Sequence, residues 1–233
     1  LPTTRAAVLT APLLLLYAAF AGGFAGWLRI KADVRAPYTR KIFHVLIFTT
    51  AGILHVAGGL PMVALFGGLT TLVVLYAVWR GDRFPFYEAM ARPTDAPKRS
   101  MFILVPLGTT AAGGLLSNLF FGPFAAVGYL VGGWGDAIGE PVGTAFGKHR
   151  YKVPSLGGVP ATRSFEGSAA VLAVGVGAAC LALWMAGFGA GSILMVGLAC
   201  GVAGALVESV SNHGLDNLTI QIAAAGTAWL LLG

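Results

Sequence analysis

Two acidic side chains in a glycine-rich stretch are the strongest candidates for chemistry in this sequence. Asp136 and Glu140 lie four positions apart between Gly132 and Lys148. Residues four apart share one face of a helix, so a helical stretch aligns both carboxylates with Thr144 and Lys148. Paired carboxylates bind a divalent cation such as Mg2+, or they form ion pairs with Arg or Lys inside a helix-packing motif. The spacing leaves both interpretations open.

Glycines repeat with the same spacing on a neighbouring face of that stretch, at Gly135, Gly139, Gly143 and Gly147. Small residues let helices approach closely in lipid, so the stripe predicts either packing within the chain or a homodimer interface. Pro141 interrupts the stretch and has no N–H to donate. We therefore expect the helix to kink or end there and leave backbone groups free to approach a ligand.

A basic segment, residues 146–167, leads into the next apolar run. Ser164 or Thr162 is placed to cap the helix that begins there, and Glu166 falls in its first turn. Free N–H groups at a helix start bind anions, so Arg163 beside them predicts a polyphosphate site. An ordinary capped helix with basic flanks is the alternative.

A third polar cluster contains Glu208, Asp216 and Asn217. Their oxygens suit Mg2+, which prefers carboxylates and substrate phosphates. Taken alone, the cluster is a polar turn with a helix cap. It gains weight only if the fold brings it to the other clusters.

The fourth cluster, Arg40, Lys41 and His44, opens an apolar run. Arg40 and His44 lie one helical turn apart on the same side. This pattern suits a phosphate clamp with a general base, and it equally suits a basic anchor at the membrane surface with a packed histidine.

The composition shows what kind of protein must position these clusters. Of 233 residues, 57% are hydrophobic and only 10% are charged, and the mean hydropathy is +0.81. Soluble domains carry about 25% charged residues, so a soluble domain and a disordered chain are both excluded. We expect one integral membrane domain over residues 1–233, in a bacterial or archaeal inner or plasma membrane.

The apolar runs are long and unbroken, which favours helices over the alternating strands of a barrel. A crossing needs about 20 residues, so we predict an all-α, polytopic transmembrane bundle of about eight spans. Glycine accounts for 34 residues and favours close packing of these helices. The predicted spans are 6–28, 42–58, 61–79, 101–119, 124–145, 168–187, 191–209 and 218–232.

Charged residues are distributed unevenly between the connectors. With eight spans, every basic residue except Arg5 lies on one face, in the connectors 29–41, 80–100 and 146–167. Lys and Arg mark the cytoplasmic side, so we expect both termini outside and an active surface on the cytoplasmic face, where the acidic residues also gather. We expect no nucleic-acid partner.

Four short motifs, in order, resemble the membrane kinases that use CTP to phosphorylate lipid alcohols. This family includes dolichol, phytol and farnesol kinases and the CTP-dependent diacylglycerol kinase, and it is distantly related to phosphatidate cytidylyltransferases. The resemblance runs from about residue 40 to the end. The motifs are Arg40-Lys41-x-x-His44, Gly135-Asp136 with Gly143 and Gly147-Lys148, Arg163-Ser164-x-Glu166-Gly167-Ser168, and Asp216-Asn217-Leu218-Thr219-Ile220.

The resemblance implies roles for these residues. Asp136 and Asp216 would lie near the metal and the triphosphate, Lys148 and Arg163 on phosphates, and the segment 166–168 at the nucleotide. The sequence departs from the family in three places: Arg163-Ser164 replaces Lys-Thr, Glu140-Pro141 replaces small residues, and Gln221 stands where proline is common.

The combined hypothesis is Mg2+-assisted transfer of a phosphoryl group from CTP to a long-chain isoprenoid alcohol such as a polyprenol, dolichol or phytol. Its catalytic residues would be Asp136, Asp216 and His44 or a carboxylate as the base. Metal ligands would be Asp136, Glu140, Glu208 and Asp216. Nucleotide-binding residues would be Arg40, Lys41, Gly143, Gly147, Lys148, Arg163, Ser164, Glu166, Gly167, Ser168 and Asn217.

Two other functions fit parts of the pattern. A cytidylyltransferase acting on phosphatidate would use the same CTP and Mg2+ but release pyrophosphate. A transporter would place Asp136 and Glu140 on an ion path through broken helices. The gathering of charges on one side argues against a transporter.

Overall fold

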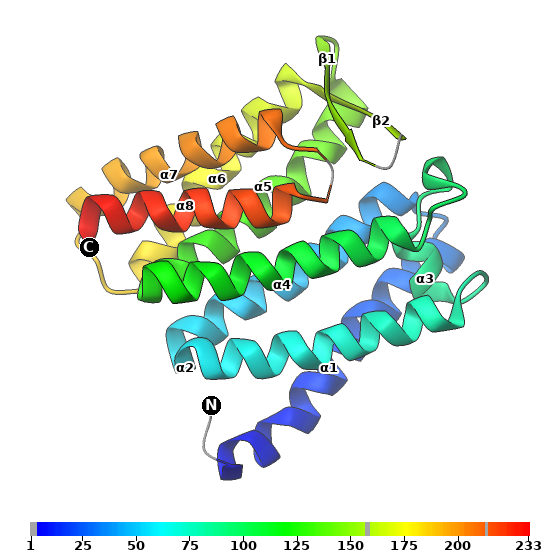
Figure 1. Cartoon of the computed structure of the whole chain (residues 1–233), viewed down its shortest axis with the longest axis horizontal. Coiled ribbons are helices and arrows are strands. Elements are labelled where there is room, and N and C mark those ends of the chain that lie inside the picture. Colours follow the sequence, from blue (N-terminus) through cyan, green and yellow to red (C-terminus); the bar gives the residue numbers. More distant parts are fainter. Residues whose placement is uncertain (1–3, 157–158, 213) are drawn as a thin grey trace.

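The computed structural model describes residues 4–156, 159–212 and 214–233, and these form a bundle of long helices with one small hairpin (Figure 1). The elements before the hairpin are α1 (Thr4–Lys31), α2 (Ala36–Arg80), α3 (Pro85–Met90), η1 (Pro93–Asp95), α4 (Met101–Phe121), η2 (Gly122–Phe124) and α5 (Ala125–Phe146). The remaining elements are β1 (Arg150–Leu156), β2 (Val159–Ser164), α6 (Phe165–Met185), α7 (Ala190–Val210) and α8 (Asp216–Leu232). The prediction of an all-α membrane bundle is confirmed.

Five helical segments in the described residues are long and apolar enough to cross a membrane. They cover 8–31, 36–80, 101–146, 165–185 and 190–210. Segments 36–80 and 101–146 contain 45 and 46 residues, whereas one crossing needs about 20. The chain is therefore a multi-pass membrane protein, while the number of eight crossings stays a prediction.

The helix α2 is bent back on itself, as Figure 1 shows. The bend lies at Gly59, whose φ of +64° is a left-handed value that favours glycine. Pro61 follows two residues later, where the sequence predicts a short Gly-Pro turn. We call residues 36–58 the first arm of α2 and residues 60–80 its second arm.

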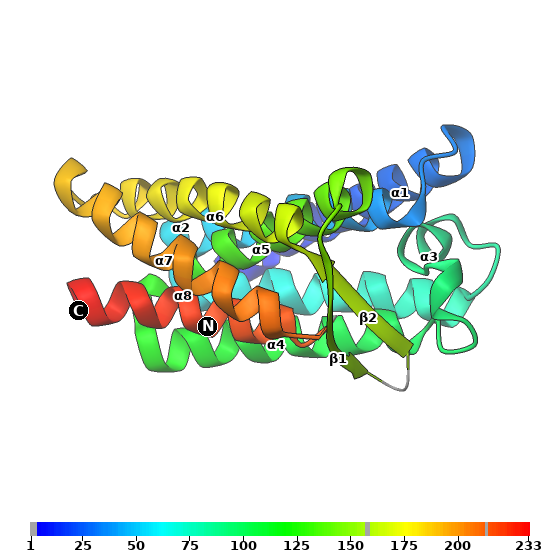
Figure 2. The same ribbon diagram turned by 90° about the horizontal axis from the view of Figure 1, so that it is seen from above.

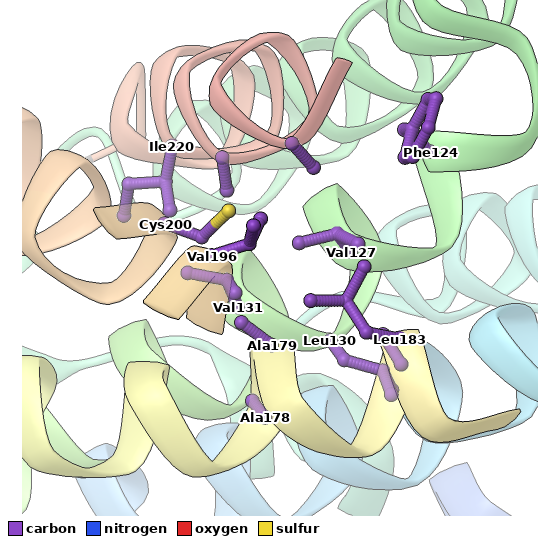
Figure 3. Packing of buried hydrophobic residues seen from close by; sticks show 13 residues of the cluster. Phe124, Val127, Leu130, Val131, Ala178, Ala179, Leu183, Val196, Cys200 and Ile220 are labelled. Carbon is purple, nitrogen blue, oxygen red and sulfur yellow. The ribbon is translucent and has the colours of Figure 1, made fainter. Parts of the chain in front are cut away.

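The main apolar core surrounds α5, which is buried along most of its length. Leu130 and Val131 of α5 contact Leu183 of α6, Val196 of α7 and Ile220 of α8 in one cluster (Figure 3). Because lipid is as apolar as these side chains, close van der Waals packing and not water exclusion holds the helices here. The core fixes α5, and α5 carries Asp136 and Glu140.

The glycine stripe of α5 packs against α6 of the same chain. A Cβ added to Gly139 would lie 2.7 Å from Val171 Cγ2, and one added to Gly167 would lie 2.9 Å from the Gly139 carbonyl oxygen. The stripe thus serves packing within the chain. The helix does not end at Pro141, because α5 continues to Phe146 while packed closely on α6; a kink there stays a prediction.

All three basic connectors and the turn before α8 lie at one end of the bundle (Figure 1). The turns at Gly59, at η2 and between α6 and α7 lie at the other end, near the C-terminus. Segment 146–167, expected as a loop, contains the antiparallel hairpin β1–β2, in which Tyr151 pairs with Arg163. Figure 2 shows this hairpin projecting from the polar end.

Candidate active site

A buried group of charged side chains lies where the first arm of α2 meets α5. Lys41 Nζ is 2.7 Å from Asp136 Oδ2 and 3.5 Å from Glu140 Oε2. His44 Nε2 is 3.5 Å from the same oxygen of Asp136. We call these four residues the polar centre. Both carboxylates point the same way along α5, as their spacing predicts, and each of them faces a cation.

The next group, which we call the Arg163 cluster, contains Arg163, Glu208 and Asp216. Arg163 Nη1 forms an ion pair with Glu208 Oε1, and Nη2 lies 3.0 Å from Asp216 Oδ2. The guanidinium also donates to the carbonyl oxygen of Ser211. All three side chains are at most 7% exposed. A buried guanidinium with this many acceptors holds the ends of β2, α7 and α8 together.

The polar centre and the Arg163 cluster are neighbours. The charges of Asp136 and Asp216 are close enough to repel each other, and the charge of Arg163 acts on Asp136. Motifs that are up to 175 residues apart in the sequence therefore meet at one place. Lys41, Asp136, Arg163 and Asp216 come from all four motifs, so the fold meets the condition under which the third cluster gains weight.

A polar cavity of about 160 Å³ opens beside these groups. Its lining comes from α5, from β2 and the start of α6, and from α7. Ser164 caps α6, because its Oγ accepts a hydrogen bond of 3.1 Å from the N–H of Gly167. The lining residues are Gly139, Glu140, Gly143, Thr144, Arg150, Thr162, Arg163, Ser164, Gly167, Ser168 and Glu208.

A second cavity, of about 100 Å³, lies beside His44, between the arms of α2 and α4. Its walls are mostly apolar, but Arg40, His44 and Asn217 are part of its lining. The ring of His44 stacks on Phe48 with centroids 4.3 Å apart. The polar centre therefore borders both cavities, through Glu140 at the polar one and through His44 at the apolar one.

Several residues that sequence reasoning missed hold the polar centre in place. Arg92 Nη1 lies 2.8 Å from Glu140 Oε1, and Arg92 Nε lies 3.0 Å from Asp95 Oδ2. Burial alone would lower the pKa of Arg92, but the charge of Glu140 and the hydrogen bond to Asp95 raise it above its usual value. The only available sequence signal was its place in a basic connector.

The same connector is fixed to the bundle by Arg99. Its guanidinium lies 2.7 Å from Glu88 Oε2 and donates to the carbonyl of Ala91. Burial raises the pKa of Glu88, but the hydrogen bonds from Arg99 and from the backbone N–H of Arg83 lower it by a larger amount. The net shift of the pKa is therefore downward. Arg92 therefore sits on a well-held segment.

Six of the predicted nucleotide-binding residues are not in the lining of the polar cavity: Arg40, Lys41, Gly147, Lys148, Glu166 and Asn217. Lys148 is exposed, and its ammonium group forms no ion pair within the described part of the chain. Glu166 turns outward to His149, whose Nδ1 is 2.7 Å from Glu166 Oε1. Gly147 packs under Ser164, whereas Gly143, Ser164, Gly167 and Ser168 line the cavity.

The four predicted metal ligands all have cationic partners. Across residues 4–156, 159–212 and 214–233, no three His, Cys, Asp or Glu side chains gather as a ready metal site. However, Mg2+ commonly takes one or two carboxylates and completes its shell with water and substrate phosphates. The charges of Asp136 and Asp216 repel each other, which a bound cation would relieve, and Asn217 Oδ1 is buried with no hydrogen-bond partner among the described residues. This donor set fits a magnesium ion that arrives with phosphates.

Comparison with known proteins identifies one relative of known activity. The chain is 30% identical over 198 residues to the phytol kinase of Synechocystis sp., and the match covers 83% of this chain and 79% of that protein. No family model matches the chain, and no solved structure matches it. The assignment to a family therefore rests on this match, and the assignment of the candidate site rests on the geometry described above.

Proposed function

The chain belongs to the family of lipid-alcohol kinases that includes phytol kinase, and we propose that it transfers the γ-phosphoryl group of CTP to a long-chain isoprenoid alcohol. It is a membrane kinase with an alcohol acceptor. One observation supports the proposed site most strongly. The buried polar centre borders, through Glu140, a polar cavity that suits nucleotide phosphates and, through His44, an apolar cavity that suits a lipid.

The polar cavity is proposed as the site of the CTP phosphates. Its lining includes Arg150 and Arg163 together with the capped start of α6. Backbone N–H groups at a helix start and arginine guanidinium groups both favour phosphate oxygens. The cavity also borders Glu140 and Glu208, so an anion entering it needs further positive charge to offset these carboxylates.

Mg2+ is the proposed source of that charge, with Asp136 and Asp216 as its protein ligands. When bound, it would neutralise charge on the transferring phosphoryl group. Lys41 and Arg163 would then exchange part of their contact with the carboxylates for contact with phosphate oxygens. Glu140 and Glu208 stay paired with Arg92 and Arg163 and position these cations.

The acceptor hydroxyl is proposed to reach the centre from the apolar cavity, beside His44. Its oxygen attacks the γ-phosphorus, the bond from that phosphorus to the β-phosphate oxygen breaks, and CDP leaves. The hydroxyl proton passes to His44 Nε2, which has no hydrogen-bond partner in the described residues. Asp136, 3.5 Å away, stabilises the resulting imidazolium. Phosphoryl transfer needs mainly positioning and charge neutralisation, and these residues supply both.

The reaction is proposed to occur on the cytoplasmic face with both termini outside. The site lies at the end of the bundle that holds the three basic connectors (Figure 1). Lys and Arg concentrate in cytoplasmic loops. An alcohol that lies in the membrane and a water-soluble nucleotide would then meet at the surface where the cell holds its nucleotides.

The direct test is a reaction panel with purified protein in detergent and Mg2+. Each of CTP and ATP, labelled in the γ-phosphate and separately in the base, is incubated with phytol, geranylgeraniol, a long polyprenol, diacylglycerol or phosphatidate. The proposal predicts a γ-labelled isoprenyl phosphate and free CDP. A base-labelled CDP-lipid with release of pyrophosphate would instead make the protein a cytidylyltransferase, and transfer from ATP alone would overturn the choice of donor.

A further inference from the structure

A third cavity, of about 260 Å³, continues the apolar one along the two arms of α2 and α4. Both cavities are lined by Ile47, Phe48 and Thr110, so they adjoin each other. We infer that together they form a tail channel that holds one isoprenoid chain, with its hydroxyl at His44 and the chain end near Leu60. This inference rests on the proposed function and adds the position and the size of the acceptor.

The polar atoms of the tail channel are concentrated at its His44 end. Four buried atoms there have no hydrogen-bond partner among the described residues: Arg40 Nη1, His44 Nε2, Thr70 Oγ1 and Asn217 Oδ1. Thr70 and Asn217 are 5% and 4% exposed. A buried donor or acceptor without a partner is costly. An alcohol group can donate one hydrogen bond and accept two, so it suits a place with both unpaired donors and unpaired acceptors.

The rest of the tail channel offers a chain almost no polar partner. Beyond Thr110 its walls are formed mainly by apolar side chains such as Phe48, Val63 and Phe66, and by glycines. Ester carbonyls and a second acyl chain, as in diacylglycerol, would find neither hydrogen bonds nor room beside the narrow His44 end. The channel therefore favours a single unesterified chain.

The length of the tail channel bounds the length of the chain. From Val74 to Leu60, the second arm of α2 lines the channel and rises about 21 Å at roughly 1.5 Å per residue. This is about two thirds of a hydrocarbon core of roughly 30 Å. A chain of geranylgeraniol or phytol size, similar to one acyl chain, would lie within this depth.

The tail channel opens toward lipid on one side, about one helical turn from Thr70. Gly67 and Gly68 of the second arm and Ala111 of α4 are exposed, yet all three line the cavity. A chain can enter sideways through this opening, and a polyprenol that is longer than the channel would leave through it. The opening therefore predicts a gain in rate per added isoprene unit that levels off at about the size of geranylgeraniol.

A larger apolar cavity, of about 660 Å³, lies between α1, the second arm of α2 and α3. It is a weaker candidate because Lys31 is the one charged residue in its lining and none of the unpaired buried atoms borders it. It also shares no residue with the cavity beside His44. The substitutions described next lie in the tail channel, so they distinguish it from this larger cavity as the site of the chain.

The test places a bulky side chain in the tail channel beyond its polar end. A Cβ added at Gly67 would meet nothing within 4 Å, and the same holds at Gly177 of α6, which lies outside the cavities described above. We predict that Gly67→Phe lowers kcat/KM for geranylgeraniol by roughly 10- to 200-fold, the range for misfit in a hydrophobic pocket. The KM for CTP, which does not enter the tail channel, should stay within about twofold of the parent value, and Gly177→Phe should change neither value.

A second variant on the facing wall, Ala111→Phe, guards against a folding defect in the first. Each purified variant is compared with the parent protein for its elution in gel filtration and for its KM for CTP. If well-folded Gly67→Phe and Ala111→Phe both keep the parent kcat/KM for geranylgeraniol, the tail channel is wrong. If the parent protein phosphorylates no alcohol from any nucleotide, the proposed function fails instead, so the two failures are distinguishable.

Discussion

The polar cavity and the tail channel both border the polar centre, and they differ in how their buried polar atoms are satisfied. Around the polar cavity, Arg163, Ser164 and Glu208 all have partners within the chain. In the tail channel, Arg40, His44, Thr70 and Asn217 each have one buried atom with no hydrogen-bond partner among the described residues. The first side is held rigid by its own ion pairs, whereas the second is completed by what it binds.

A substitution in the polar centre, which borders both cavities, should cause the largest loss of activity. Asp136→Asn removes the charge that Lys41 and His44 both face, and Glu140 remains as a second partner that keeps Lys41 paired. We expect kcat to fall by about 10^3-fold or more, as for loss of one preorganised electrostatic group, with the protein still folded. Initial rates and a thermal melt measure the two parts of this prediction.

Asp82→Asn is the matched control for that variant. Asp82 is also paired with an arginine, Arg99, but its side chain is 73% exposed and lies outside the site. An exposed ion pair contributes little to stability, so both activity and melting should stay near the parent values. Full activity of Asp136→Asn would remove Asp136 from the reaction.

Substitutions of Arg163 test whether its ion pairs hold the helix ends around the polar cavity together. Arg163→Met leaves Glu208 and Asp216 buried beside each other without a cation. Breaking a buried ion pair in this way costs about 3–5 kcal/mol of folding stability. Denaturation of the purified protein should therefore shift strongly, and Arg163→Lys should recover part of the loss. An unchanged midpoint for Arg163→Met would show that the cluster does not hold the helix ends together.

Much of the polar side could be predicted from the sequence because charged residues stand out in a membrane chain. The spacing of Asp136 and Glu140 predicted a common face, and the Ser164 cap was predicted from its position before an apolar run. The cations that face these carboxylates could not be predicted, because Lys41 lies 95 residues before Asp136. Such pairing depends on how α2 and α5 pack.

The tail channel could not be predicted at all, for a related reason. Gly67, Val63 and Ala111 are apolar or small residues like those on any lipid-facing surface, and only the bend at Gly59 turns them toward each other. The hairpin β1–β2 was not predicted either. Its first strand has only seven residues, and so short a mixture of polar and apolar residues is a weak indication of a strand. Tertiary packing supplied this part of the fold.

A smaller effect is expected when the mouth of the polar cavity is narrowed. Thr144 of α5 is exposed and lines that cavity. A phenylalanine there should raise the KM for CTP by about tenfold, in line with overpacking costs of roughly 1–3 kcal/mol. The KM for the alcohol should not change. An effect on the alcohol alone would reverse the assignment of the two cavities.

The smallest effect is expected at Glu166, which the family resemblance places at the nucleotide. In the structure this carboxylate faces His149 on the surface and not the polar cavity. Glu166→Gln should therefore change the KM for CTP by no more than about twofold. A loss of tenfold or more would show that Glu166 turns inward when CTP binds, and it would extend the polar cavity to include this residue.

The most direct test of the arrangement is a matrix of initial rates, with CTP and geranylgeraniol varied independently, for the parent protein, Thr144→Phe and Gly67→Phe. If CTP reaches the polar centre through the polar cavity and the alcohol through the tail channel, Thr144→Phe raises the KM for CTP alone. Gly67→Phe then lowers kcat/KM for the alcohol alone. If either variant affects both substrates equally, or the wrong one, the two substrates do not occupy the polar cavity and the tail channel as assigned.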